Sequence, residues 1–409
     1  MMGRSIGLLF SVLLASLPQT HVYGRKGGNG HKGNHILPNH SKNGSVMPSG
    51  GISRHASPPG NAHGDACVSG AVIPNLEPPA GALVVDIGIH KSKGNFFATV
   101  PEAFKRAAEL TPTQDVIIFI KRGKYAGKST LDLLVQGREN KHSVTVYGET
   151  PNMCDHSLNL VHLTHHATFD TPDSKQGLNS ITTLTLTGYH ISVYNLKIEN
   201  TGTKNQAPAL STKGQYQYLY GCSMMSEQDV WYLFIGSAMF IRGNITSIVD
   251  MISNKGAGLV VTDSTITIAN SGKRDQVFIL ASGRENDKDP GSIVDNCHIE
   301  FSPGKEWRDD HVFLGRDWKQ WALASIQNTF IDGPMKPWSE LGWSRWKKND
   351  HHYDAHYTYY NLTGDGVRRY KGTNHFYAAK APVKFATWLA PDYYKFLDPR
   401  FASWNEGQR

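Results

Sequence analysis

The chain has 409 residues, which is enough to bury a large core. Its formal net charge is +7, but six of its 42 Lys and Arg fall within residues 1–64, where there is no acidic residue. The remainder therefore holds 36 basic against 35 acidic residues. A nucleic-acid-binding domain needs a basic folded surface, so this near-neutral body argues against nucleic acid as a partner.

Residues 1–24 have the pattern of a secretory signal peptide. A charged start, Met1–Arg4, precedes the apolar run Ile6–Leu17, which is too short to span a membrane. Val22–Gly24 supplies small or permissive residues for cleavage. We therefore expect a secreted protein, without a membrane anchor, whose mature chain starts near Arg25.

Residues 25–64 are rich in Gly, His, Pro, Asn and Ser and are predicted to be a flexible basic tail. Its five His are irregularly spaced, which favours a linker over a metal site. Asn39 and Asn43 begin N-x-S sequons in the tail, and Asn244 and Asn361 begin N-x-T sequons in the body. Secretion would make them candidates for glycans, Asn244 being the weakest because it lies between Asp229 and Asp250, two candidate catalytic residues.

Residues 65–409 are expected to form one all-β domain. Short β-branched runs recur along it, as at residues 116–120, 143–147, 181–198 and 258–269, with one short helix predicted at Pro101–Leu110. A further helical cap is expected near Pro391–Phe401.

The four cysteines are Cys67, Cys154, Cys222 and Cys297. An exported chain permits disulfides, and the sequence leaves all three full pairings open. Cys222 and Cys297 lie in strand-like segments, where a buried thiol is at least as plausible as a bridge. No C-x-x-C or H-E-x-x-H pattern indicates a metal site.

Three polar residues are almost evenly spaced: Gln206, Asp229 and Asp250 are separated by 23 and 21 residues. Such a period is typical of one coil of a parallel β-solenoid, in which neighbouring coils stack about 4.8 Å apart. The three side chains would then form a column. Two carboxylates that close cannot both ionise easily, so one becomes an acid and the other a nucleophile. Asparagine suits the left-handed corners of a solenoid, and six residues are expected there: Asn195, Asn200, Asn244, Asn254, Asn296 and Asn328.

Seven motifs in conserved order make the chain resemble the pectin methylesterase (pectinesterase) family of carbohydrate esterases. The family's QAVAL appears here as QAPAL (206–210), its QDTLY lies at the end of LYGCSMMSEQDVWY (219–232), and its GTVDFIFG matches ITSIVDMISN (245–254). Its QGR element matches ILASGRENDKDP (279–290), and its LGRPW matches LGRDW (314–318). Its GW-x-x-W matches GWSRW (342–346), and its NNTGPG matches YYNLTGDGV (359–367). The resemblance implies a right-handed parallel β-helix, a single-stranded solenoid.

The resemblance also implies a role for each site residue. Asp250 would be the nucleophile on the methyl ester of a galacturonate unit, and Asp229 the general acid and then the base. Arg316 would hold Asp250 ionised and oriented. Gln206 and Gln228 would donate to the oxyanion.

Aromatic residues are expected to bind the substrate, methyl-esterified pectin. Trp318 would pack on a sugar ring, and Trp231, Tyr232 and Trp343 are further candidates, although packing explains Trp231 and Trp343 equally well. We expect a monomer that needs no metal or other cofactor.

The chain departs from the family at several positions. QDVW replaces QDTL, and Ser253 stands where DFIFG has its second Phe, which predicts an altered substrate groove. Asp317 replaces Pro beside Arg316 and is expected to compete with Asp250 for the guanidinium group.

Two rival functions follow. A polygalacturonase-type glycosidase on the same fold is disfavoured because the chain lacks N-x-D and G-H-G. A catalytically weakened protein that only binds pectin or another wall polysaccharide is the alternative that the departures leave open.

Overall fold

The computed structural model describes residues 67, 70–134, 142–203, 205–269, 277–302, 312–332, 343–344, 355–367 and 376–389. All of them belong to one compact unit, Asn61–Arg409. The expected signal peptide, the basic tail and the C-terminal helical cap lie outside the described residues.

Two sheets account for the described strands, and every pairing between named strands is parallel. The larger sheet contains β1 (Leu83–Val85), β2 (Phe96–Phe97), β3 (Val116–Ile120), β5 (Ser129–Asp132), β6 (Val144–Gly148), β8 (Leu184–Thr187), β9 (Ile191–Tyr194), β11 (Leu210–Tyr220), β13 (Trp231–Ile241), β15 (Ile252–Asn254), β16 (Gly258–Thr262), β18 (Val277–Ser282), β19 (Ser292–Asp295), β21 (Val312–Asp317), β22 (Leu323–Gln327), β24 (Trp343–Ser344), β25 (His356–Tyr360) and β26 (Phe376–Ala378). The smaller contains β4 (Gly123–Ala126), β7 (Val161–His165), β10 (Leu196–Asn200), β12 (Ser223–Met225), β14 (Asn244–Ser247), β17 (Thr265–Ile268), β20 (His298–Phe301) and β23 (Phe330–Ile331).

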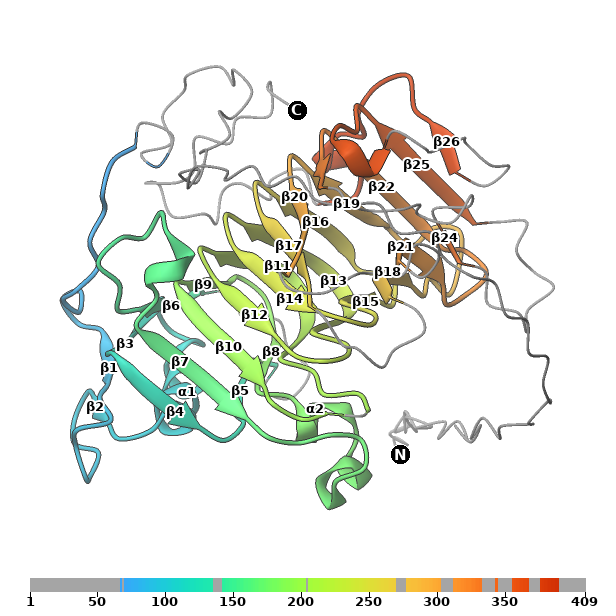
Figure 1. Cartoon of the computed structure of the whole chain (residues 1–409). Helices are drawn as coiled ribbons and strands as arrows, with labels where there is room; N and C mark the ends of the chain where they lie inside the picture. The colour runs from blue at the N-terminus through green and yellow to red at the C-terminus, as the bar shows by residue number, and fades with distance from the viewer. Residues whose placement is uncertain are drawn as a thin grey trace, which may run out of the picture. The chain divides into compact units, whose positions relative to one another are not determined.

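The strands wind into the right-handed parallel β-helix that the family resemblance implies, and each coil has three faces. The larger sheet consists of two ladders of paired strands. The long strands β11 and β13 join the ladders, because each bends at a glycine and pairs in one ladder before the bend and in the other after it. The smaller sheet forms the third face. Figure 1 shows its strands stacked in chain order, from β4 and β7 at one end to β20 towards the other.

The expected coil length is confirmed at the centre of the solenoid. Trp231 lies opposite Ile252, and Gln228 forms a parallel bridge with Val249, so both pairs are 21 residues apart. The evenly spaced column is wrong in one respect. Leu210 lies opposite Trp231, which places Gln206 two residues away from the position opposite Asp229.

Apolar side chains fill the inside of the solenoid along its length. Leu210, Trp231 and Ile252 occupy equivalent positions on successive coils, and all three are fully buried in one continuous core. Helix α1 (Val100–Leu110) matches the predicted helix and adds Phe104 and Ala107 to this core at its N-terminal end. The remaining described helices are short: α2 (Leu178–Ile181), η2 (His156–Leu158), η3 (Pro172–Gln176), η5 (Asp365–Val367) and η6 (Phe385–Thr387).

The left-handed corners only partly follow the prediction. Asn195, Asn296 and Asn328 have positive φ as expected. The other three expected residues, Asn200, Asn244 and Asn254, instead lie within strands. Equivalent corners on the intervening coils are formed by Gly221, Arg242 and Asp263.

One disulfide joins Cys67 to Cys154, with a Cα–Cα distance of 5.4 Å. Cys222 and Cys297 are free thiols buried in the core. This resolves the pairing that the sequence left open.

Candidate active site

Asp229 and Asp250 occupy equivalent turns on adjacent coils, each between the smaller sheet and the next strand of the larger one. The Asp229 amide donates to the Val249 carbonyl, so the two aspartates lie one coil apart, about 4.8 Å along the axis. Both have left-handed backbones, with φ of 60° and 49°. Aspartate tolerates this conformation better than most residues. Both residues are almost completely buried, with 2% and 3% exposed.

Arg316 holds the Asp250 carboxylate with two hydrogen bonds. Its Nε donates to Oδ1 at 2.7 Å and its Nη2 to Oδ2 at 2.5 Å. The guanidinium also lies over the ring of Phe278, 5.2 Å from its centroid, and Phe278 stacks on Phe313. This two-bonded ion pair keeps the Asp250 carboxylate oriented.

Asp229 is in the opposite electrostatic situation. Burial, and then the charge of Asp250, raise its pKa to about 7 against opposing effects of Ser253, Gln206 and Arg316. The direction agrees with the sequence-based expectation. Asp229 is therefore suited to carry a proton, whereas Asp250 is paired with the Arg316 guanidinium group.

The two predicted oxyanion donors lie on neighbouring coils beside this pair. The backbone N–H of Ala207, which follows Gln206, donates to the Gln228 carbonyl at 3.2 Å. Both glutamines are half-buried. The Gln206 side chain reaches the Asp229 carboxyl group. Although Gln206 is out of register by two residues, it still borders the carboxylate pair.

Of the predicted aromatic contacts, Tyr232 and Trp318 lie together next to the site. Their ring centroids are 6.0 Å apart in an edge-to-face arrangement, and Asp229 contributes, after burial, to raising the Tyr232 pKa. Trp318 is half-buried and packs against the backbone of Gly283. Trp343 is described only in its backbone, in β24.

The substrate-binding role expected for Trp231 is wrong. Its side chain is fully buried, its Nε1 donates to Thr212 Oγ1 at 3.0 Å, and it packs against Phe240. Because successive side chains of a strand point to opposite faces, Trp231 faces the core where Tyr232 faces outwards.

The competition expected from Asp317 is not observed. Arg316 and Asp317 are consecutive in β21, and Asp317 is buried. Burial of Tyr357 in the core raises its pKa, and the nearby charge of Asp317 raises it further. Asp317 therefore faces away from the pair that Arg316 forms with Asp250.

Sequence reasoning missed three residues of the site. Ser253 Oγ donates to Asp229 Oδ1 at 2.9 Å, and Phe278 and Phe313 support the Arg316 side chain. Ser253 was visible as a departure from the family motif, but only as a change in the groove. The two phenylalanines gave no signal, because they lie in ordinary apolar strand segments.

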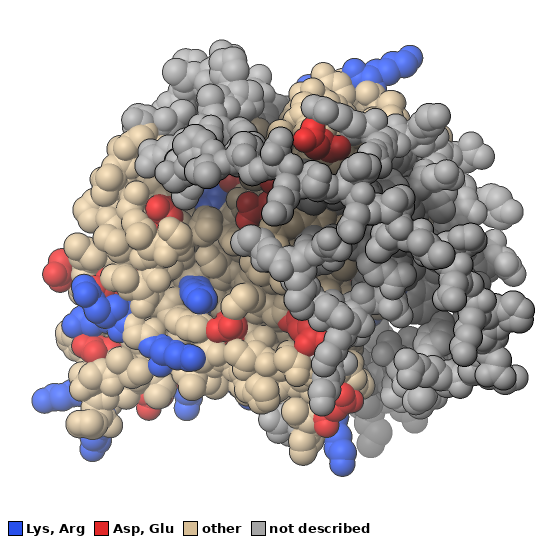
Figure 2. Space-filling model, viewed as in Figure 1, with Lys and Arg blue, Asp and Glu red and all other residues tan. Residues whose placement is uncertain are grey.

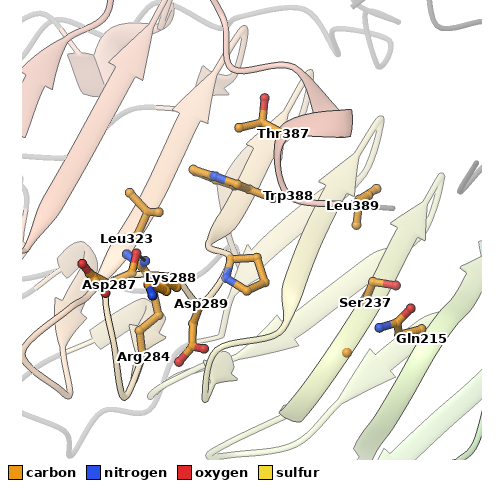
Figure 3. Close-up of a pocket in the computed structure, with 12 residues that line it drawn as sticks. Gln215, Ser237, Arg284, Asp287, Lys288, Asp289, Leu323, Thr387, Trp388 and Leu389 are labelled. Atoms are coloured by element: carbon orange, nitrogen blue, oxygen red, sulfur yellow. Dashed lines mark hydrogen bonds between the residues drawn. The ribbon is translucent and has the colours of Figure 1, made fainter. Parts of the chain in front are cut away.

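A separate hollow of about 460 Å³ contains none of the predicted site residues. Figure 3 shows Arg284 and Asp289 on one side of it and Trp388 on another, with Gln215 and Ser237 at its edge. Arg284 donates hydrogen bonds to the backbone carbonyls of Trp321 and Asp287, and these bonds restrain the loop that lines this hollow.

Within the described part of the chain, no group of three or more His, Cys, Asp or Glu is arranged to hold a metal ion. None of the helices described is long and apolar enough to cross a membrane.

Comparison with known proteins gives a consistent assignment. A family model named Pectinesterase matches residues 86–382. A pectinesterase of Aspergillus aculeatus is 26% identical over 329 residues, which cover 79% of this chain and 93% of the relative. A pectinesterase of Petunia integrifolia is 26% identical over 303 residues, covering 69% and 74%.

Solved structures agree in fold. The deglycosylated pectin methylesterase of Aspergillus niger has a TM-score of 0.67 and 25% identity, and the match covers 80% of this chain and 99% of that one. The carrot pectin methylesterase has a TM-score of 0.61 at 19% identity, with 81% and 97% covered.

Fold and site together define a parallel β-helix protein with a buried aspartate pair on one outer face. The family model covers well over half of the sequence. The chain belongs to the pectinesterase family of carboxylic ester hydrolases.

Proposed function

We propose that this protein removes methyl esters from the galacturonate units of pectin, releasing pectate and methanol. Family membership supports hydrolysis of pectin methyl esters. The observation that carries the assignment of this site is the contrast between its two carboxyl groups. Asp250 is held by two hydrogen bonds from Arg316, whereas Asp229 is buried with its pKa raised to about 7.

In the first step, an Asp250 carboxylate oxygen attacks the ester carbonyl carbon. The bond from that carbon to the methoxy oxygen breaks, and Asp229 gives its proton to this oxygen, so methanol leaves. Gln206 and Gln228 donate hydrogen bonds to the oxyanion that forms during the attack. The product of this step is an anhydride between Asp250 and the galacturonate unit.

In the second step, water attacks the acyl carbon and ionised Asp229 accepts its proton. The bond to Asp250 breaks, pectate is released, and both aspartates return to their starting forms. Every proton transfer involves Asp229, and the covalent intermediate involves Asp250, so the mechanism requires no metal.

The assignment is tested by substituting each aspartate and comparing methyl-pectin with an activated ester. Asp250→Asn should reduce methanol release by about four orders of magnitude or more, with pectin still bound, because no other group can attack the ester. Asp229→Asn should also be severely impaired on methyl-pectin, yet retain acylation by an ester whose leaving group needs no proton. If Asp250→Asn kept turnover of the activated ester while Asp229→Asn lost it, the two roles would be reversed.

The same methanol-release assay separates this function from its rivals. The esterase frees methanol from methylated pectin, a glycosidase would shorten the polysaccharide, and a weakened binding protein would do neither. The inward orientation of Asp317 favours the esterase over the binding protein, because it leaves the Arg316 contact with Asp250 intact.

We further propose that the protein is secreted, is glycosylated and acts on pectin as a monomer, with residues 25–64 as a dispensable tail. The N-terminal leader supports secretion, and Asn361, one of the N-x-T sequons, is exposed. On the face in Figure 2, the described Lys and Arg lie among Asp and Glu rather than in a continuous basic surface, which fits a partner other than nucleic acid.

A further inference from the structure

Ser253 is the one hydroxyl group bonded directly to the candidate acid among the described residues. It lies in β15, opposite Tyr232 on the preceding coil and Ala281 on the following one. Its neighbour Ile252 points into the core, so alternation along the strand turns Ser253 towards the outer face that carries the site. Ser253 is 3% exposed, and its Oγ donates to Asp229 Oδ1 at 2.9 Å.

The two oxygens of Asp229 have different surroundings. Oδ1 accepts the hydrogen bond from Ser253, whereas Oδ2 is buried with no hydrogen-bond partner in the described part of the chain. A neutral carboxyl group has one O–H donor and one carbonyl oxygen. Because Oδ1 accepts this hydrogen bond, a neutral Asp229 keeps the bond when Oδ1 is its carbonyl oxygen and Oδ2 carries the proton.

We infer that Ser253 is a positioning residue, which fixes Asp229 so that Oδ2 presents its proton to the departing methoxy group. The inference rests on the proposed function. The family motif has phenylalanine at this position, and phenylalanine has no donor, so this arrangement distinguishes the present chain. Because Oδ2 has no hydrogen-bond partner among the described residues, its proton is free to be donated once a substrate oxygen comes within hydrogen-bond reach.

The same hydrogen bond also tunes the acid. Ser253 donates more strongly to the ionised than to the neutral carboxyl group, which lowers the Asp229 pKa against burial and the charge of Asp250. The other charged or titratable groups facing Asp229 are Arg316, which acts in the same direction as Ser253, and Tyr232. Removing the hydroxyl group should therefore raise the pKa further and leave the Gln206 side chain as the remaining hydrogen-bond partner of the Asp229 carboxyl group.

The test compares Ser253→Ala with Ser253→Thr, which keeps the hydroxyl group, and with Ser325→Ala. Ser325 is a matched control: it is fully buried and its Oγ also donates one side-chain hydrogen bond, but to Gln327. For Ser253→Ala we expect kcat/KM for methanol release to fall about tenfold at mildly acidic pH, and its alkaline limb to move up by about one pH unit. Ser253→Thr and Ser325→Ala should keep the wild-type limb.

A second readout does not depend on activity. The infrared C=O band of protonated Asp229, identified by its loss in Asp229→Asn, is titrated with pH in the substrate-free protein. The midpoint should be higher in Ser253→Ala than in the wild type and in Ser325→Ala. If the wild type frees methanol but Ser253→Ala has the same titration midpoint and the same alkaline limb as the wild type, the inference is overturned and the proposed function stands. If the wild type freed no methanol while Ser253→Ala still shifted the midpoint, the proposed function would be overturned, and only the effect of Ser253 on the Asp229 pKa would remain.

Discussion

At the scale of single residues, the site depends on one aspartate that is costly to bury. Asp229 is 2% exposed, and within the described part of the chain only one of its oxygens has a hydrogen-bond partner. Its charged form is disfavoured by burial and by Asp250, so the protein gives up stability at neutral pH in order to keep a proton there. This predicts two distinct pH dependences, one of activity and one of stability.

Activity should be lost as pH rises through about 7. The first step needs protonated Asp229, and the fraction that is protonated falls above its pKa of about 7. We expect kcat/KM for methanol release to decrease about tenfold per pH unit well above that value. A pH–rate profile corrected for spontaneous ester hydrolysis measures this, and a flat profile up to pH 9 would exclude Asp229 as the acid.

The free energy of unfolding should fall as pH rises through the range in which Asp229 titrates, whereas an ordinary ion-paired carboxylate makes it rise with pH. The Asp229 pKa is higher folded, at about 7, than its unfolded value near 3.8, so the native state binds the extra proton between these values. Its favourable contribution is complete below pH 3.8 and is lost as pH rises through 7. Relative to Asp229→Asn, the wild type should lose up to about 1.4 kcal/mol of unfolding free energy per pH unit in this window. Denaturant unfolding of both proteins at several pH values measures the difference, and parallel curves would contradict it.

At the scale of elements, the solenoid face that carries the site depends on glycines at the bends of its long strands. Gly188, Gly214 and Gly236 stack on successive coils with φ of +132°, +131° and +103°. A Cβ atom at Gly214 would lie 1.9 Å from the Gly188 carbonyl oxygen, and one at Gly236 would lie 1.9 Å from that of Gly214. Only glycine lets neighbouring coils approach this closely while β11 and β13 turn from one ladder to the other.

Gly214→Ala should therefore be strongly destabilising. The new methyl group meets backbone, which cannot move without shifting the adjacent coil, so we expect a loss of about 3 kcal/mol or more. Gly127→Ala is the matched control, since Gly127 has φ of +104° but nothing within 4 Å of its Cβ position, and it should cost only about 1–2 kcal/mol. Equal losses in thermal or denaturant unfolding would show that backbone conformation, rather than contact between coils, sets the requirement.

At the scale of the whole molecule, the solenoid is stabilised along its axis by a continuous apolar core, and one covalent link holds the N-terminal segment. Cys67 and Cys154 are 87 residues apart, so their bond removes a large loop from the unfolded ensemble. Cys222 and Cys297 are buried on inner faces, and burial raises the pKa of both thiols, that of Cys222 to about 12.

Replacing both bridged cysteines, as Cys67→Ser with Cys154→Ser, should lower the free energy of unfolding by about 3–5 kcal/mol. Methanol release should persist at low temperature, because neither residue contacts the aspartate pair. Alkylation provides the control: the native wild type should not react, and the unfolded, unreduced protein should react at two thiols. Labelling of Cys222 or Cys297 in the native protein would contradict their placement in the core.

The sequence by itself indicated the fold and the candidate site residues. Parallel coils repeat a register, so the 21-residue interval from Asp229 to Asp250 was enough to place both carboxyl groups on adjacent coils. Arg316 was found through its motif, since the contact with Asp250 spans two further coils of unequal length. These assignments depend on spacing and residue type, which a sequence displays directly.

The tertiary structure decided which way side chains face and what they touch. In the apolar run that includes Trp231 and Tyr232, hydrophobicity does not distinguish the inner face of the strand from the outer face, because either residue can occupy either face. The alternation of side chains along the folded strand places Trp231 in the core. The same alternation turned Asp317 away from Arg316. The Ser253 bond to Asp229 and the Phe278 contact with Arg316 each join residues of different coils. Their partners depend on register across coils of variable length, and that register is fixed only when the whole solenoid packs.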